Sequence, residues 1–402
     1  MSILTYLKKN GIGYALQVVW RYKLPKLLNK MVLPFVKGKP LHDTIVIESH
    51  NDFDCNGGAF YDYLLKEGYN RRYKIVWLLK NKKPGKLPRN VKAVPLYGPS
   101  IRKSYYICTA KYLLSDNVIT DKNRPEQISL FCNHGAVSLK SVHGLYNVPD
   151  DVDYLLTPSV FFSSILAHEY SVTDGTRRFV CMGYPFHDVF YRETPDELDK
   201  LTTKKYEKVF LWMPTFRKGG GYKRNDSEME QPFGVPLIET EETFAQLQTF
   251  LEEHNCLLII KIHPMQDPAT IARLQGSDNI IVLTGTSVKE LGIDNYRLVK
   301  SADALISDYS SIAFSYMLLD RPVGFVLEDQ KAYTRGFITD NIEEYLAGAH
   351  IYNFREFLAF LESVQAGEDT YGDVRRTLAQ KVFTHHDGES CRRIAELLKL
   401  EK

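Results

Sequence analysis

Two serines stand where an apolar strand pattern changes into a helical one. Ala304–Ser307 is typical of a buried strand, Asp308 and Tyr309 follow it, and Ser310 and Ser311 open an amphipathic segment. The unpaired backbone N–H groups and the positive dipole end at a helix start favour an anion, and two hydroxyls add donors. A helix cap would explain one serine, but not the whole turn. We expect Ser310 and Ser311 to bind phosphate and Asp308 to orient the turn.

Two further strand ends carry cationic or polar side chains. The strand predicted at 257–262 carries Lys261 near its end, and His263 follows the strand. Side chains alternate along a strand, so Lys261 and His263 point to the same side. The strand predicted at 209–213 is followed by Thr215 and Arg217, a hydroxyl and a guanidinium suited to phosphate contacts. A lone histidine is more often structural, but the place of His263 at a strand end favours a functional role.

A second histidine lies at the end of the strand predicted at 128–132. Asn133, His134 and Gly135 follow it, and the glycine permits close approach of backbone or ligand. A neutral imidazole here can act as a general base near pH 7, whereas the alternative is a hydrogen-bonded histidine in a turn. Seven other histidines lack a comparable setting, and most of them are assigned to the surface or to packing: His143, His168, His187, His254, His350, His385 and His386.

No metal site is expected. Asp52 and Asp54 form a DxD pattern, which some metal-dependent transferases use, but we interpret it as a loop that caps the following helix. The six cysteines contain no CxxC pair, and their spacing suits neither a zinc site nor a disulfide scaffold. Free thiols in a reducing cytosol are the simpler interpretation.

Apolar strand patterns alternate with helical ones from residue 43 onward, which predicts parallel sheets covered on both faces. A polar stretch at 192–208 divides the strands into two series. We therefore predict an α/β protein with two doubly wound, Rossmann-like domains facing a cleft, at 43–200 and 201–375. The stretch 373–400 is predicted to be helical, and a final helix within 376–402 to pack back on the first domain.

The first 42 residues contain eight basic and no acidic residues. Apolar residues recur among them at helical spacing, and Pro25 and Pro34 are expected to break the pattern into short pieces. Such a segment could lie on an anionic membrane surface, although a helix packed on the protein's own core is the alternative. Basic residues interrupt every apolar run, so neither a signal peptide nor a spanning helix is expected, and we expect a cytoplasmic protein.

The whole chain of 402 residues has 51 basic and 49 acidic residues. This balance argues against a protein that binds nucleic acid over its surface, because such proteins are more basic.

Taken together, these motifs make the sequence from about 44 to 354 similar to the CDP-glycerol glycerophosphotransferase family, bacterial enzymes that prime or polymerise teichoic acid and related capsule backbones. The similarity is carried by short motifs along the chain, of which the Asp308–Ser311 turn with the downstream Asp320-Arg321-Pro322 is the most specific. The other matching pieces are Asp62–Leu65, Tyr73–Trp77, His134-Gly135, Gly183–Pro185, Pro214–Arg217, Lys261–Pro264 and Arg335–Phe337.

The resemblance implies a GT-B fold, peripheral association with the cytoplasmic face of the membrane, and a CDP-activated polyol as donor. It also implies that His134 and His263 are the two functional histidines, that Thr215, Arg217, Lys261, Ser310 and Ser311 bind the donor diphosphate or nucleotide, and that Gly135, Asp308 and Arg335 support them. The family's Trp and Thr around its His-Gly pair are replaced by Asn133 and Ala136, and an Arg-Asn pair by Phe186 and His187. These departures put the acceptor and the polyol in question more than the reaction.

The expected function is transfer of glycerol phosphate, or another polyol phosphate, from a CDP-activated donor to a hydroxyl of a lipid-linked or polysaccharide acceptor, with release of CMP. No tightly bound cofactor is expected; the use of Mg²⁺ is left open, and the sequence does not indicate a site for it. Two alternatives remain: a GT-B glycosyltransferase that uses a nucleotide sugar, and a non-catalytic assembly protein at the membrane surface.

Overall fold

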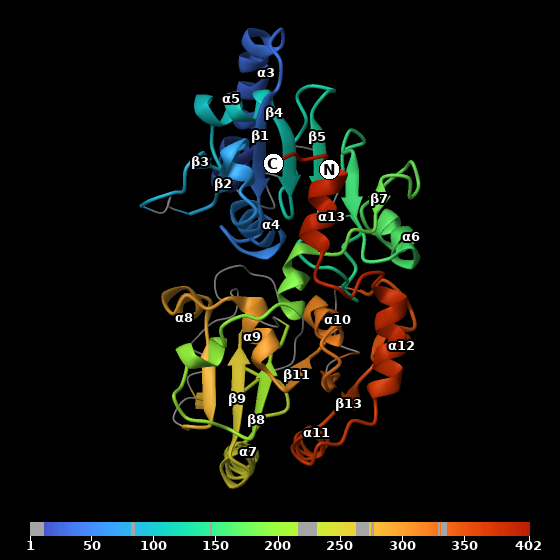
Figure 1. Ribbon diagram of the computed structural model, residues 1–402. Coiled ribbons are helices and arrows are strands. Elements are labelled where there is room, and N and C mark those ends of the chain that lie inside the picture. The colour runs from blue at the N-terminus through green and yellow to red at the C-terminus, as the bar shows by residue number, and fades with distance from the viewer. Residues whose placement is uncertain are drawn as a thin grey trace. The chain divides into compact units, whose positions relative to one another are not determined.

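The computed structural model describes residues 12–81, 85–144, 147–215, 231–262, 273–274, 277–328, 330 and 336–402. These residues form two compact units (Figure 1). The first unit comprises the described residues of 1–134, 146–188 and 387–402, and the second comprises those of 135–145 and 189–386.

The first unit is built on a seven-stranded parallel sheet in the order β3-β2-β1-β4-β5-β6-β7. The strands are β1 (His42–Glu48), β2 (Lys74–Leu79), β3 (Val91–Pro95), β4 (Ala110–Ser115), β5 (Ile128–Phe131), β6 (Tyr154–Leu156) and β7 (Phe179–Val180). Besides the N-terminal helices described below, its helices are α4 (Cys55–Lys66), η2 (Tyr69–Arg71), α5 (Ile101–Thr109), α6 (Val160–Glu169) and α13 (Ser390–Leu397). Apolar residues run along both faces of β1 and β2, as a sheet covered on both sides requires.

The second unit repeats this plan with a six-stranded parallel sheet in the order β10-β9-β8-β11-β12-β13. Its strands are β8 (Lys208–Trp212), β9 (Cys256–Lys261), β10 (Ile280–Leu283), β11 (Ala304–Ser307), β12 (Val323–Val326) and β13 (Ala349–Ile351). Its helices are η4 (Glu197–Lys200), α7 (Glu241–Glu253), α8 (Gly285–Glu290), α9 (Asn295–Ser301), α10 (Ser311–Met317), η7 (Ile342–Tyr345), α11 (Phe354–Gln365) and α12 (Gly372–Val382). The helix η3 (Pro185–Tyr191) spans the boundary between the two sets of residues.

Both sheets have the Rossmann strand order, counted from the first strand of each unit as 3-2-1-4-5-6. The predicted fold, an α/β chain with two doubly wound sheets, is therefore confirmed. In such a sheet the strand order reverses between the first and fourth strands, and ligands bind beyond their carboxyl ends. These switch points lie between β1 and β4 in the first unit and between β8 and β11 in the second.

Large buried side chains fix the second sheet against its helices. Trp212 on β8 packs against Phe357 of α11, with ring centroids 5.1 Å apart. A Cβ at Gly324 on β12 would lie 2.8 Å from Ile351 and 2.9 Å from Phe360, so only glycine allows α11 and β13 to pack this closely. The carboxyl ends of β8 and β11 are thus held by a rigid core.

The C-terminal stretch predicted as one helical segment contains two helices, in different units. Helix α12 ends at Val382, where Phe383 is extended, and Gly388 before α13 has a φ of 70°, a left-handed conformation that glycine adopts at low cost. The first-unit residue Asp188 accepts hydrogen bonds from the backbone of Ser390 at 2.9 Å and Cys391 at 3.0 Å. This carboxylate caps α13 and fastens the end of the chain to the first unit.

The N-terminal segment differs from its prediction as well. The two prolines do not divide residues 12–36, which run through α2 (Ile12–Val18), a π-helical turn η1 (Val19–Lys23) and α3 (Leu24–Val36). Pro25 occupies the first turn of α3, where its missing N–H costs no hydrogen bond, and Pro34 lies in the last turn. Helix α3 packs on α5. Among the described residues, no helix is both long and apolar enough to span a membrane.

Candidate active site

At the switch point of the second unit, a buried carboxylate joins the ends of β8 and β11. Asp308 accepts hydrogen bonds from the Thr215 backbone N–H at 2.7 Å and from the Thr215 hydroxyl. Ser307, one residue earlier, donates to the Met213 carbonyl at 3.0 Å. Asp308 and Thr215 are both buried. These bonds fix the two turns relative to each other, which is the orienting role that the sequence suggests for Asp308.

The two predicted phosphate-binding serines follow this carboxylate directly. Ser310 is the N-cap residue of α10, but its side chain makes no capping hydrogen bond. Ser311 begins the helix and lies against Gly135, where an added Cβ would be 2.9 Å from the Ser311 Oγ. Capping therefore does not account for Ser310, and the close approach predicted at Gly135 is confirmed.

The segment that follows Gly135 contributes a cation that sequence reasoning missed. Lys140 pairs with Phe337 in an isolated antiparallel bridge, and its Nζ lies 3.4 Å from the Thr215 Oγ1. Hydrogen bonds from Ser141 to Gly336 and from Ile338 to Leu139 continue this pairing. The sequence signal that could have identified Lys140 is a basic residue five positions after Gly135. Lys140 brings positive charge to the Thr215 turn, which Asp308 joins to the turn that carries the serines.

The other donor-side predictions are only partly within the described residues. Lys261 is the last residue of β9, next to β8 in the sheet, and is half-buried. Arg217, His263 and Arg335 lie outside the described residues, so their roles remain predictions.

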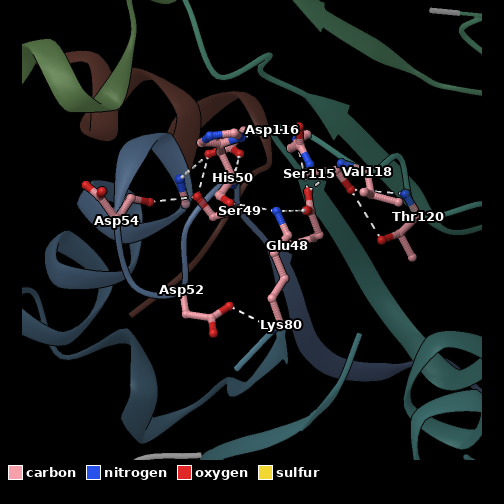
Figure 2. A network of polar contacts seen from close by, with 12 residues as sticks. Glu48, Ser49, His50, Asp52, Asp54, Lys80, Ser115, Asp116, Val118 and Thr120 are labelled. Carbon is pink, nitrogen blue, oxygen red and sulfur yellow. Dashed lines mark hydrogen bonds and ion pairs between the residues drawn. The ribbon is translucent and has the colours of Figure 1, made fainter. Parts of the chain in front are cut away.

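The switch point of the first unit has a similar construction (Figure 2). Asp116 follows β4, and its carboxylate accepts hydrogen bonds from the Ser49 hydroxyl at 2.6 Å, the His50 backbone at 2.5 Å and the Gly57 backbone at 3.2 Å. Asp116 is fully buried. The carboxylate thus ties the turn after β1 and the start of α4 to the end of β4.

A second buried carboxylate lies beside it. Glu48, the last residue of β1, accepts hydrogen bonds from the backbone of Asn117 at 3.0 Å and Val118 at 2.9 Å, and its Oε1 lies 3.6 Å from the Lys80 Nζ. Burial raises the pKa of Glu48, although Lys80 and the backbone donors oppose the shift. Burial and the nearby charge of Glu48 raise the pKa of Asp116 to about 7. Two carboxyl groups at one sheet edge therefore resist simultaneous ionisation.

The predicted DxD loop belongs to the same region. The capping prediction is confirmed for Asp54, the N-cap residue of α4, whose side chain accepts from the Cys55 backbone at 2.7 Å. Asp52 instead accepts from the backbone of Lys80 at 2.9 Å and Asn81 at 2.8 Å. The described part of the chain contains no group of three or more His, Cys, Asp or Glu residues arranged to hold a metal ion.

His134 follows a left-handed turn at the end of β5. Asn133 has a φ of 56°, a conformation that asparagine tolerates better than most residues, and its Oδ1 accepts from the His134 backbone at 2.9 Å. The Asn133 carbonyl accepts from Asn56 at 2.6 Å, and its Nδ2 donates to the Tyr170 hydroxyl at 2.7 Å. Asparagine in place of the family's tryptophan thus suits this backbone.

The ring of His134 faces a residue that the sequence analysis left unassigned. The imidazole of His50 stacks on it, with centroids 4.4 Å apart and planes 12° from parallel. His187, which was assigned to the surface or packing, is buried and its ring contacts Phe186 at 4.4 Å. No local motif marks His50, because its partner lies far away in the sequence.

The pKa of Asp116 makes stability depend on pH. Because this pKa is higher in the folded than in the unfolded chain, the folded state holds a proton that the unfolded state releases between about pH 4 and 7, and stability falls as pH rises through that range. Deprotonation of Asp116 changes the free energy of unfolding by on the order of a few kcal/mol. We expect the apparent melting temperature to fall less between pH 5 and 8 in Asp116→Asn than in the wild type, measured by circular dichroism. The exposed Asp150→Asn is the control, and parallel curves for Asp116→Asn and wild type would contradict the assignment.

Sequence comparisons find similar proteins among teichoic acid enzymes. The teichoic acid glycerol-phosphate primase of Bacillus subtilis (strain 168) is 26% identical over 295 residues, covering 69% of this chain and 68% of that protein. The teichoic acid ribitol-phosphate primase of Bacillus spizizenii is 23% identical over 386 residues, covering 89% of this chain and 91% of that protein.

Solved structures show the same fold. The wall teichoic acid polymerase TagF superposes with a TM-score of 0.71 at 19% identity, over 99% of this chain and 98% of that one. A putative UDP-N-acetylglucosamine 2-epimerase from Listeria monocytogenes gives a TM-score of 0.52 at 12% identity, over 89% of this chain and 96% of that one. The model of the family described as CDP-Glycerol:Poly(glycerophosphate) glycerophosphotransferase matches residues 33–400. The chain therefore belongs to the CDP-glycerol:poly(glycerophosphate) glycerophosphotransferase family.

Proposed function

We propose that this chain transfers glycerol phosphate from CDP-glycerol to a hydroxyl of a lipid-linked or polysaccharide acceptor in the synthesis of a teichoic acid or a related capsule polymer. Family membership supports the donor, and the primases and polymerase among its relatives support the kind of product. The observation that carries the proposal is the turn after β11. There Asp308 is fixed to Thr215, and Ser310 and Ser311 follow at a switch point, where such folds bind ligands.

The reaction needs positioning and charge stabilisation more than covalent catalysis. The acceptor oxygen forms a bond to the β-phosphorus, which carries the glycerol. The bond from that phosphorus to the bridging oxygen breaks, and its electron pair leaves with CMP. The hydroxyl proton of the acceptor passes to His134, the proposed general base. Ser310, Ser311 and Lys140 hold the diphosphate and stabilise the charge that develops on CMP, together with His263 and Arg217 as predicted from the sequence.

Connectivity supports the pairing of base and donor turn. His134 is joined by one peptide bond to Gly135, and Gly135 lies against Ser311. General bases must come within hydrogen-bond reach of the proton they accept. His134 is thus the residue directly before the glycine that lies against this turn.

Replacement of the base tests this mechanism. We expect His134→Ala to lower the turnover of CMP release from CDP-glycerol by ~10²–10⁴-fold, because a general base contributes that much, while affinity for the donor changes little. Turnover is measured with a lipid-linked acceptor, and affinity by calorimetry. The matched control is His168→Ala, an exposed histidine of α6.

An unchanged turnover in His134→Ala would remove its role as base. The same assay with CDP-ribitol and a panel of UDP-sugars tests the substrate class. Turnover only with UDP-sugars would favour a glycosyltransferase, and no turnover with any donor would favour the non-catalytic alternative.

We further propose that α3 brings the protein to the cytoplasmic face of an anionic membrane. Leu27, Met31 and Phe35, at four-residue spacing, are 54%, 61% and 80% exposed and form one stripe along α3. Exposed lysines at seven-residue spacing run beside the stripe: Lys23, Lys30 and Lys37. Apolar side chains flanked by cations suit the interface between lipid headgroups and acyl chains.

Membrane association has two separable components. We expect Leu27→Ser/Met31→Ser/Phe35→Ser to bind phosphatidylglycerol vesicles at least ~10-fold more weakly at any salt concentration, because apolar burial is lost. Lys23→Gln/Lys30→Gln/Lys37→Gln should bind these vesicles ~10-fold more weakly than the wild type only at low salt, because high salt already screens the lysine charges of the wild type. Vesicle co-sedimentation measures both, with the exposed Val160→Ser of α6 as control. Equal binding of all variants, or equal binding to neutral phosphatidylcholine vesicles, would contradict the proposal.

A further inference from the structure

The stacked pair of His50 and His134 is the feature of the first unit that the proposed mechanism leaves unexplained. Both rings belong to this unit, and they lie nearly parallel at 4.4 Å. His50 follows β1 and His134 follows β5, so the pair joins the carboxyl ends of two strands on either side of β4. A contact between residues so far apart in sequence depends on the exact placement of both turns.

The backbone of His50 is anchored on both sides. Its N–H donates to Asp116 at 2.5 Å, and its carbonyl accepts from the Lys80 Nζ at 2.6 Å. Figure 2 shows His50 and Ser49 on the turn after β1, facing Asp116 on the neighbouring strand end. The Nδ1 atom of the ring lies 3.4 Å from the Asn117 Oδ1. The backbone of His50 is therefore fixed by the Asp116 carboxylate and by Lys80, and its ring contacts Asn117.

Loss of water around the ring and the charge of Lys80 together favour the neutral form of His50. Burial lowers the pKa of His50, and the charge of Lys80 lowers it further, whereas the Asn117 contact and Asp54 act in the opposite direction. Two cationic rings at 4.4 Å would also repel each other. The neutral ring of His50 is a flat surface that His134 can contact without electrostatic cost.

The turn that carries His134 fixes its backbone but leaves its ring to be placed by contacts. Asn133 holds the His134 N–H, and Asn56 holds the Asn133 carbonyl. Rotation about χ2 of a histidine is broad and follows its surroundings. A stacked neighbour restricts that rotation, because a turned ring would lose the face-to-face contact.

We propose that His50 is a positioning residue for His134, whose stacked ring holds the imidazole plane so that the proton-accepting nitrogen meets the acceptor hydroxyl in one orientation. This inference rests on the proposed role of His134 as the base. It assigns no proton transfer to His50. The ring shape of His50, and not its ability to titrate, is what the reaction uses.

Two substitutions separate ring shape from imidazole chemistry. We expect His50→Ala to lower kcat for CMP release by ~10–100-fold, because a misplaced base costs that much, with the KM for CDP-glycerol unchanged. His50→Phe keeps an aromatic face and should stay within ~3-fold of the wild type. His42→Ala, at the exposed opposite end of β1, is the matched control. Melting temperatures show that each variant is folded, and the Phe variant tests the inference even if the Ala variant unfolds.

The same substitutions in the His134→Ala background show whether His50 acts through His134. The effects of substituting two residues that act as a unit do not add. We therefore expect His50→Ala to change the residual rate of His134→Ala less than ~2-fold. An equal loss in both backgrounds, a wild-type rate in His50→Ala, or a Phe variant as slow as the Ala variant would each overturn the inference and leave the role of His134 intact. A wild-type rate in His134→Ala would instead overturn the proposed base and the inference with it.

Discussion

A buried aspartate at the end of the fourth strand holds the switch point of each sheet together. Asp116 follows β4 and binds the turn after β1, and Asp308 follows β11 and binds the turn after β8. A buried carboxylate is stable only when hydrogen bonds replace its water, so neither turn can move away without a large loss. The turn that carries His50 and the turn that carries the paired serines are therefore each held by a buried aspartate.

The two aspartates also reveal a likeness between the units that the sequence analysis did not find. Leu114-Ser115-Asp116 and Ile306-Ser307-Asp308 occupy equivalent places in sheets of the same strand order. The residues after the two aspartates differ. Asn117 follows Asp116, whereas Tyr309 and the paired serines follow Asp308. One scaffold has thus been used for an imidazole pair in the first unit and for hydroxyls and Lys140 in the second.

The sequence predicts the features that depend on neighbouring residues. Continuous apolar runs predict the central strands, and the Asp54 cap and the close approach at Gly135 follow from single residue types. The short strands β3, β7, β12 and β13 have weak patterns, and their pairing with neighbouring strands stabilises them. The π-helical turn before Pro25 and the break between α12 and α13 depend on local backbone geometry that periodicity does not describe.

The unpredicted parts of the candidate site are long-range contacts. Asp116 lies 67 residues from Ser49, and Lys140 lies 75 residues from Thr215, so no spacing rule connects them. His50 has no motif around it, and only the fold brings it to His134. Their positions at strand ends and the resemblance to a family both point to His134 and the paired serines, whereas the buried aspartate contacts became visible only in the structure.

The central claim is that the turn after Asp308 binds the diphosphate of CDP-glycerol, and calorimetric titration of the donor tests it most directly. Because hydrogen bonds to a charged group are each worth about 1.5–3 kcal/mol, the account predicts that Ser310→Ala/Ser311→Ala weakens the Kd at least ~10-fold with an unchanged melting temperature. Ser301→Ala, at the end of α9 in the same unit, should bind as the wild type does. A double variant that binds CDP-glycerol with the wild-type Kd would contradict the account.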